Sequence, residues 1–290
     1  MRALSLFIAA LGASAVCPAP GHSCEVIVVK SADLKPYQDV LRGFKDATSC
    51  TVREAALNDG KLLQDDPPDA VFAIGTSAFK AVKAIKGLPL VYAMVMPSET
   101  SGANSTLSGV SMDISPETYV TAIKEVFPSA KRIGLLYDPR NTRTFVGEAA
   151  RAASAAGIEL VVSEVRAPAE IPALLNALQG KIDVFWMIPD PALVISEFVD
   201  VLLRFSFEKS VPVFTFSGKY AEMGAVAALE VDPYDMGAQA GEIVNRLTAT
   251  RSDAIRVYAR SSHLVLNMKV ANKMGIRIRD EVSRKGKRIE

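Results

Sequence analysis

Short apolar stretches and amphipathic helical stretches alternate along most of this chain, and this alternation constrains the fold more than any other feature. Residues 69–83, with the sequence DAVFAIGTSAFKAVK, show the pattern clearly. Residues 71–74 form a continuous apolar run, as expected for a strand that is covered on both faces. Gly75 permits a tight turn, and a helix follows directly. Strands separated by single helices pair in parallel through right-handed crossovers, so the pattern predicts an α/β fold.

The alternation occurs in two series, which a polar stretch at 97–106 separates. In the first series we expect strands at 25–30, 51–57, 69–74 and 88–95, and helices at 36–47, near 60–65 and at 77–85. In the second series we expect strands at 132–138, 158–165, 183–188 and 211–217, and helices at 116–127, 142–156, 168–178 and 192–207. The sequence therefore predicts two doubly wound parallel-sheet lobes.

The remaining segments are expected to pass between the lobes and form a hinge of several crossings. They are residues 107–114, a crossing strand at 225–233, a returning helix at 234–247, a strand pair at 255–260 and 263–268, a short helix at 269–274 and a charged, solvated tail. We assign residues 24–113 and about 232–262 to a first lobe, 114–231 to a second lobe, and 263–290 to a C-terminal strand, helix and tail. The sequence does not decide which of the two lobes carries this last segment.

The first 23 residues are typical of a secretory signal peptide. Their apolar run at 3–16 is shorter than the roughly 20 residues that a membrane span needs. Cleavage after Ala15 or nearer Ser23 fits the small residues there. A lipid anchor on Cys17 is less favoured, because the residues before it fit a lipobox poorly. We therefore expect a periplasmic or otherwise extracytoplasmic protein.

The charge balance argues against some partners. The chain has 33 basic and 32 acidic residues, and the first 23 residues hold one of the basic ones, so 32 of each remain after cleavage. Nucleic acids and anionic membranes bind surfaces with an excess of basic residues. We expect neither as a partner.

Export makes the positions of two cysteines informative. Cys24 stands directly before the strand at 25–30, and Cys50 stands directly before the strand at 51–57. In a βαβ unit the starts of two such strands lie side by side, so the pattern predicts a Cys24–Cys50 disulfide. Two buried free thiols are the alternative.

Polar residues follow the carboxyl ends of the expected strands, where open α/β sheets bind their ligands. The candidate ligand-binding residues are Ser31, Tyr37, Gly75, Thr76 and Ser77 in the first lobe, and Asp138, Asn141, Thr142, Asp190 and Ser217 in the second. Some have structural alternatives. Asp190 precedes a proline and can cap a helix, as Asn141 and Thr142 can, and Tyr37 can simply cover its own helix. Trp186 lies within an apolar strand and is expected in the core.

No catalytic or cofactor motif accompanies these residues. The run from Gly75 to Phe79 begins like a nucleophile elbow, but Phe79 replaces the final glycine. The only histidine beyond the signal segment is His263, which gives neither a base near Ser77 nor a zinc-ligand cluster. No glycine-rich nucleotide motif occurs either. We therefore expect a binding protein without metal or cofactor, and not an enzyme.

An ordered set of motifs covering residues 25–278 resembles the periplasmic substrate-binding proteins of ABC importers with the type I, two-lobed fold. The motifs are VVKSADLKPYQDVLRGF, DAVFAIGTSA, LPLVYAMV, LSGVSMDISPE, EVFPSAKRIGLLYDP, GIELV, DVFWMIPD, VPVFTFS, GAVAALEVDPYDMGAQAGEI and LVLNMKVANKMGI. The chain is most similar to a subfamily of uncharacterised substrate-binding lipoproteins whose characterised relatives bind aromatic amino acids.

The resemblance implies a clamp in which a small ligand enters between the lobes and hinge rotation buries it. In such a clamp the turn at 75–77 would hold a carboxylate, Asp190 would pair with an ammonium group, and Tyr37 would contact the apolar part of the ligand. The chain departs from the family pattern at 96–99 and at 137–139, where Asp-Pro and Asn-Pro pairs are common. These departures leave the identity of the ligand open.

We therefore expect the solute-binding component of an ABC uptake system, which binds an amino-acid-like ligand as a monomer and delivers it to a membrane permease. Aromatic amino acids are candidates for the ligand. The alternative is a periplasmic sensory binding protein that signals to a membrane receptor or kinase. A cytoplasmic sugar regulator of the same fold would need a DNA-binding helix pair where the signal segment lies.

Overall fold

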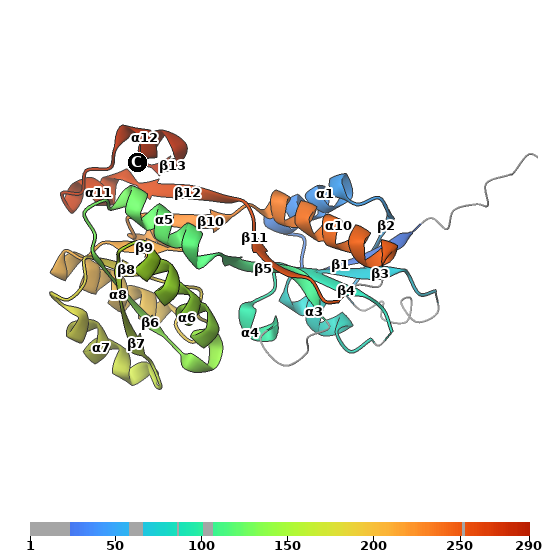
Figure 1. Cartoon of the computed structure of the whole chain (residues 1–290), viewed down its shortest axis with the longest axis horizontal. Helices are drawn as coiled ribbons and strands as arrows, with labels where there is room; N and C mark the ends of the chain where they lie inside the picture. The colour runs from blue at the N-terminus through green and yellow to red at the C-terminus, as the bar shows by residue number, and fades with distance from the viewer. Residues whose placement is uncertain (1–23, 58–65, 86, 101–106, 251–252) are drawn as a thin grey trace, which may run out of the picture.

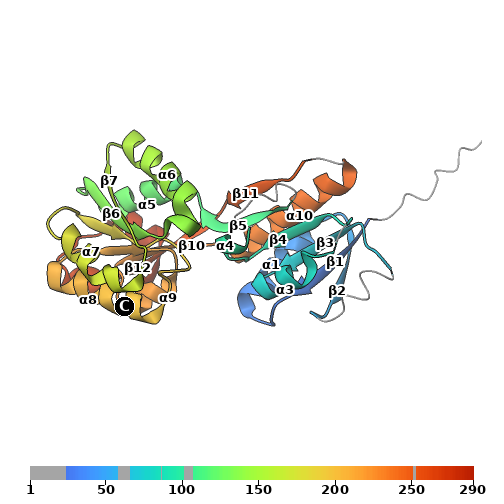
Figure 2. The same cartoon turned by 90° about the horizontal axis from the view of Figure 1, so that it is seen from below.

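Two α/β lobes joined by a narrow waist make up the computed structural model (Figures 1 and 2). It describes residues 24–57, 66–85, 87–100, 107–250 and 253–290. The predicted signal peptide with Cys17 and the helix expected near 60–65 lie outside these residues. Among the helices that are described, none is long and apolar enough to cross a membrane.

The first lobe is built on a six-stranded parallel sheet. Its order is β11 (Arg256–Ala259), β5 (Ser108–Ile114), β4 (Leu90–Ala93), β3 (Ala70–Ile74), β1 (Glu25–Lys30) and β2 (Thr51–Ala55). Its helices are α1 (Lys35–Ala47), α3 (Thr76–Val82), α4 (Pro97–Thr100) and α10 (Pro233–Ala249). Helices α1 and α10 share one core with the sheet, and α3 packs on the opposite face. Because helices cover both faces, every residue of β3 is buried.

The second lobe is built on a seven-stranded sheet. Its order is β13 (Lys287–Ile289), β12 (Ser262–Asn267), β10 (Ala227–Val231), β9 (Val213–Thr215), β8 (Val184–Trp186), β6 (Arg132–Tyr137) and β7 (Glu159–Glu164). Its helices are α5 (Pro116–Val126), α6 (Pro139–Ala155), α7 (Ile171–Leu178), α8 (Ser196–Lys209), α9 (Gly218–Met223), α11 (Met268–Lys273) and α12 (Asp280–Lys285), with a 3₁₀ turn at Pro168–Glu170. Only the β10–β12 pairing is antiparallel among the described strands. These sheets confirm the predicted fold class.

One sequence-based expectation near the C-terminus is wrong, and another holds only in part. The strands expected at 255–260 and 263–268 do not pair with each other, since β11 joins the first sheet and β12 joins the second. The chain passes across the waist between them instead of folding back on itself (Figure 1). The tail is not solvated throughout, because α12 buries Val282 and β13 extends the second sheet beside β12.

Three connections cross between the lobes: β5 to α5, β10 to α10, and β11 to β12. Helix α10 returns from the second sheet and packs tightly on α1 in the first lobe. Glycine makes this contact possible, because a Cβ atom at Gly237 would lie 1.9 Å from the carbonyl oxygen of Val40. The hinge is therefore built from three crossing segments and is anchored by a close helix pair.

Large aromatic side chains fill the centre of the second lobe, and the prediction that Trp186 lies in the core is confirmed. Its side chain has no exposed surface and contacts the rings of Tyr119 and Phe145. In the first lobe a disulfide joins Cys24 and Cys50, whose Cα atoms are 4.6 Å apart. It links the start of β1 to the start of β2, the two strands at one edge of that sheet.

Candidate functional site

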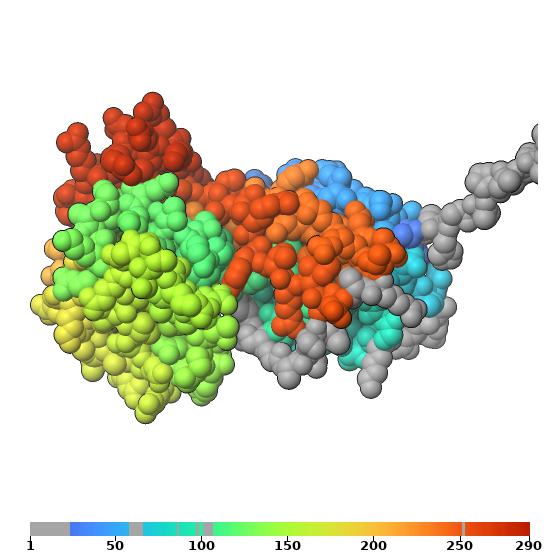
Figure 3. All heavy atoms as spheres, in the orientation of Figure 1, coloured from blue at the N-terminus to red at the C-terminus, as the bar shows by residue number. Residues whose placement is uncertain are grey.

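A cavity of about 640 Å³ lies between the two lobes. The first lobe contributes Tyr92, Thr100, Ser111, Asp113 and residues 256–258, and the second lobe contributes residues 139–145 at the start of α6. A volume of this size suits a small organic ligand. The segment that carries β11 crosses between the lobes in orange in the space-filling view (Figure 3). The cavity is therefore bordered by the hinge as well as by both lobes.

The start of α6 forms the wall of the cavity on the second lobe. Asp138 caps this helix by accepting a hydrogen bond from the Arg140 backbone N–H, and Pro139 takes the first helical position. The backbone of Thr142 departs from helical geometry, with φ −126° and ψ 16°, so α6 is kinked in its first turns. Side-chain contacts from outside the helix also hold this segment.

The Asp190 carboxylate supplies those contacts. It has no exposed surface and accepts hydrogen bonds at 2.8 Å from the Asp138 N–H, at 3.0 Å from Asn141 Nδ2 and at 2.6 Å from Thr142 Oγ1. A fourth hydrogen bond at 3.0 Å comes from the Ala192 N–H, which follows in its own loop. Because a carboxylate has about four acceptor positions, the protein satisfies Asp190 completely.

The helix dipole favours acidic residues at the start of a helix, but the first turns of α6 carry two arginines, Arg140 and Arg143. Arg140 offsets this by binding Asp138, with Nε 2.9 and 3.0 Å from the two carboxylate oxygens. The guanidinium of Arg140 holds the pKa of Asp138 below its ordinary value. Arg143 is exposed and has no hydrogen bond or ion pair among the residues that the structure describes. The cavity wall thus presents one uncompensated cation.

Asp113 provides the acidic group of the cavity on the first lobe. It lies on β5, is partly buried, and accepts a hydrogen bond at 3.1 Å from Ser111 Oγ. Burial raises the pKa of Asp113 to about 6, with the Ser111 hydroxyl opposing the shift. A carboxylate in this position favours a cationic partner when it is ionised.

A second cluster of predicted residues lies at the turn after β3. Gly75 has a φ of 90°, and a Cβ atom there would lie 2.6 Å from Ser31 Oγ and 2.8 Å from the Tyr37 hydroxyl. Ser31 Oγ also accepts a hydrogen bond at 2.9 Å from the Ala78 N–H. Ser31, Tyr37 and Gly75 are therefore packed together, and Ser31 occupies one of the free N–H groups at the start of α3.

The structure brings the predicted site residues together in two groups and leaves one residue apart. Asn141 and Thr142 line the cavity, and Asp138 and Asp190 lie behind them. The second group is Ser31, Tyr37 and Gly75 with the adjoining Thr76 and Ser77, where Thr76 Oγ1 accepts from the Met96 N–H at 3.2 Å and Ser77 is exposed. Ser217 stands apart, since it caps α9 and donates to Glu230 at 3.3 Å. Sequence reasoning missed Tyr92, Asp113, Arg143, Arg256 and Tyr258 as cavity residues.

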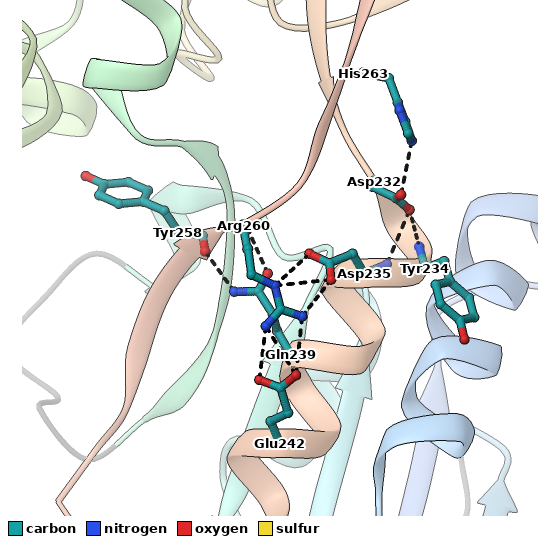
Figure 4. A network of polar contacts seen from close by, with 8 residues as sticks. All are labelled: Asp232, Tyr234, Asp235, Gln239, Glu242, Tyr258, Arg260 and His263. Atoms are coloured by element: carbon teal, nitrogen blue, oxygen red, sulfur yellow. Dashed lines mark hydrogen bonds and ion pairs between the residues drawn. The ribbon is translucent and has the colours of Figure 1, made fainter.

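A network of polar contacts holds the crossing from β11 to β12 against α10 (Figure 4). Arg260 makes ion pairs with Asp235 at 2.6 Å and with Glu242 at 3.2 Å. Gln239, which is buried, accepts from the Arg260 N–H and donates to the Tyr258 carbonyl oxygen. These contacts fix the strand at the back of the cavity.

The side chain of Tyr258 points away from this network (Figure 4) and reaches the second lobe. Its hydroxyl donates to Glu148 Oε2 on α6 at 2.5 Å. Burial raises the pKa of Tyr258, and the neighbouring Glu148 carboxylate raises it further. A side chain of the first sheet is thus bonded to the helix that forms the other wall.

The described residues do not form the histidine-containing constellation of a hydrolase or a cluster of metal ligands. His263 lies at the hinge, with Nε2 3.1 Å from Asp232 Oδ2. Within the described part of the chain, no group of three or more His, Cys, Asp or Glu side chains is placed to hold a metal ion. The cavity is lined by charged and polar side chains together with aromatic and apolar ones, which suits binding of a small polar molecule.

The chain is similar in sequence to a characterised protein and similar in fold to solved structures. A "Tyrosine-binding protein" from Clostridioides difficile is 26% identical over 232 residues, which cover 74% of this chain and 66% of that protein. A ligand-free, open structure of a substrate-binding protein with adhesive properties from Clostridium difficile shares 18% identity and a TM-score of 0.70, covering 92% of this chain and 99% of that one. A Streptococcus pneumonia ABC domain in complex with L-Trp shares 20% identity and a TM-score of 0.60, covering 92% and 100%.

These structures share the two-lobed fold described above. The sequence itself matches the family described as "ABC transporter substrate binding protein" over residues 29–289, which is nearly the whole described chain. The match agrees with the resemblance drawn from the ordered motifs. The chain belongs to the ABC transporter substrate-binding protein family.

Proposed function

We propose that this protein captures an amino-acid-like ligand between its lobes and delivers it to a membrane permease of an ABC uptake system. The observation that carries the proposal is the cavity of about 640 Å³, to which both lobes contribute residues. The names of two relatives, one a tyrosine-binding protein and one a complex with L-Trp, support an aromatic amino acid as the ligand. Aromatic side chains at the cavity, Tyr92, Phe145 and Tyr258, fit such a ligand.

Closure of the clamp is part of this proposal. Residues 24–113 with about 232–262 would move as one lobe, and 114–231 would move as the other. Residues 263–290 would move with the second lobe, because β12 and β13 belong to its sheet. The three crossing segments would act as the hinge, and no catalytic step is needed. We propose export through the signal peptide at 1–23, action as a monomer outside the cytoplasm, and a permease as the partner.

The predicted site residues take graded roles in the proposal. Asn141 and Thr142 would contact the ligand directly, since they line the cavity. Asp138 and Asp190 would hold the start of α6 in place. Ser31, Tyr37, Thr76, Ser77 and Ser217, with the Gly75 turn, would reach the ligand only as the lobes close.

A ligand screen tests the proposal. The protein, produced from the full-length chain and refolded to remove carried-over ligand, is screened by thermal shift against the amino acids, sugars and short peptides. A ligand at 100 times its Kd should stabilise the protein by about 2.7 kcal/mol. We expect aromatic amino acids to raise the melting temperature. A shift with neutral sugars alone would contradict an amino-acid ligand, and co-purification with a sensor kinase in place of a permease would favour the sensory alternative.

A further inference from the structure

Four charged side chains line the cavity between the lobes, and they differ in how the protein satisfies them. Arg140 is held by Asp138, and Arg256 donates to the carbonyl oxygens of Leu107 and Thr100. Arg143 has no ion pair within the described residues. Asp113 is the one acidic residue among the lining residues that the structure describes. Arg143 and Asp113 are therefore a cation and an anion of the cavity for which the described residues provide no ion pair.

The environment of Asp113 is incomplete for an ionised carboxylate. Its donor is the hydroxyl of Ser111, at 3.1 Å from Oδ2, and no cation pairs with it in the part of the chain that is described. A carboxylate withdrawn from water without a cation is unfavourable, and burial accordingly raises the pKa of Asp113 to about 6. A cationic group bound in the cavity would supply the missing partner.

Asp190 presents the opposite situation. Its carboxylate has no exposed surface, does not line the cavity, and already accepts four hydrogen bonds at 2.6 to 3.0 Å. An ammonium group could reach it only by displacing one of these donors and moving the start of α6. Asp190 thus holds the cavity wall formed by α6, whereas Asp113 faces the cavity itself.

We infer that Asp113 receives the ammonium group of the ligand and that Arg143 receives its carboxylate. The inference rests on the proposed function and names the charge pairs of that same site. The two residues come from different lobes, Asp113 from β5 and Arg143 from α6, so a zwitterionic ligand would connect the lobes through its own charges. Such a ligand would stabilise the closed arrangement more than an amine or an acid alone.

The assignment of Asp113 to the ammonium group predicts that ligand affinity increases as the pH rises. An ammonium ligand binds the ionised form of Asp113, so affinity should rise with pH and level off above the pKa of about 6. At pH 5 about one in eleven molecules would carry the carboxylate, so affinity should be about tenfold lower than at pH 7.5. The other charged or titratable groups around the site are Tyr92, Tyr119, Arg140, Arg143, Arg256 and Tyr258, with the carboxylates of Glu148 and Glu117 acting on Tyr258. None of these side chains ordinarily titrates between pH 5 and 7.5.

Isothermal titration with three related probes tests the inference on the full protein. The probes are L-tyrosine, tyramine, which lacks the carboxylate, and 3-(4-hydroxyphenyl)propanoate, which lacks the amine. Asp113→Asn should weaken L-tyrosine and tyramine by more than about tenfold and leave the acid unchanged. Arg143→Gln should weaken L-tyrosine and the acid and leave tyramine unchanged. Glu222→Gln, an exposed charge-neutralising change on α9 outside the cavity, serves as the control.

The outcomes separate the inference from the proposed function. If the wild-type protein binds neither L-tyrosine nor any other amino acid, the proposed function and the inference both fail. If it binds one and Asp113→Asn retains that affinity within threefold, only the inference fails. An equal loss for the amine and the acid would show that the substitution acts through the fold, and would also overturn it. The pH profile of the wild-type protein provides a readout without any variant, and a flat profile from pH 5 to 7.5 contradicts the inference.

Discussion

Replacement of Asp190 with asparagine should destabilise the second lobe by loosening the start of α6. The carboxylate is fully buried and accepts hydrogen bonds from Asp138, Asn141, Thr142 and Ala192. Asparagine has the same shape but offers one oxygen and one NH₂ group. The oxygen can keep Asn141 and Ala192, and the Thr142 hydroxyl can rotate to accept from the NH₂ group. The N–H of Asp138 then faces a donor and has no partner.

The size of this loss of stability follows from the hydrogen bonds that the substitution removes. A hydrogen bond to a charged group contributes about 1.5 to 3 kcal/mol, and a buried donor without a partner costs about 1 to 3 kcal/mol. We therefore expect the free energy of unfolding to fall by about 3 kcal/mol in Asp190→Asn. Thr142→Val, which removes one of the four donors, should cost about 1.5 kcal/mol. Thr142→Ser keeps the hydroxyl and should preserve most of that stability.

Urea unfolding followed by circular dichroism measures these differences at pH 7.5. Asp200→Asn is the matched control, because Asp200 is exposed on α8, and it should change stability by less than about 0.5 kcal/mol. A loss below 1 kcal/mol in Asp190→Asn, with an unchanged denaturant slope, would refute the assignment of Asp190 as the residue that holds α6. Ligand affinity should follow the same order, and Thr142→Ser should bind nearly as well as the wild type.

Two further predictions concern the α1–α10 contact and the disulfide of the first lobe, with a glycine of α6 in the second lobe as the comparison for the first of them. Gly237→Ala places a Cβ 1.9 Å from the Val40 carbonyl oxygen and should destabilise the protein by about 3 kcal/mol, whereas Gly147→Ala, which meets open space in α6, should stabilise it by up to about 1 kcal/mol; urea unfolding compares the two. Reduction of the Cys24–Cys50 disulfide, which spans 26 positions of sequence, should lower the free energy of unfolding by about 3.5 kcal/mol. The double Cys→Ser variant should show the same loss and no response to reductant.

The fold was predictable because local signals agreed along most of the chain. Short apolar runs such as residues 71–74, each followed by a turn signal and a helix, predict central parallel strands, and this run lies in the middle of the first sheet as β3. The partners of β11 and β12 were not predictable, because two apolar strands separated by two residues look like a hairpin in sequence. Only the presence of two separate sheets explains why the chain continues across the waist there.

The site was predictable in part, for a related reason. The rule that ligands lie beyond the carboxyl ends of strands led to Asn141 and Thr142, which line the cavity. It did not lead to residues of the hinge strands, because those strands contribute side chains along their length. A signal for Arg143 was present in the sequence: arginines in the first turns of a helix oppose its dipole, and such violations of local preference are expected at functional sites.

Asp113 also departs from an ordinary preference, because it is a carboxylate withdrawn from water without a cation beside it among the described residues. This departure can be tested without a ligand. Because burial raises the pKa of Asp113 from 3.8 to about 6, the folded protein holds this proton more tightly than the unfolded chain does. Stability contributed by this group is therefore complete below pH 4 and is lost as the pH rises through 6. Asp113→Asn removes the buried charge, so it should stabilise the ligand-free protein at pH 7.5 by about 1 to 3 kcal/mol and have little effect at pH 4. If the variant is less stable than the wild type at pH 7.5, the carboxylate is satisfied within the protein and has no need of a ligand's cation.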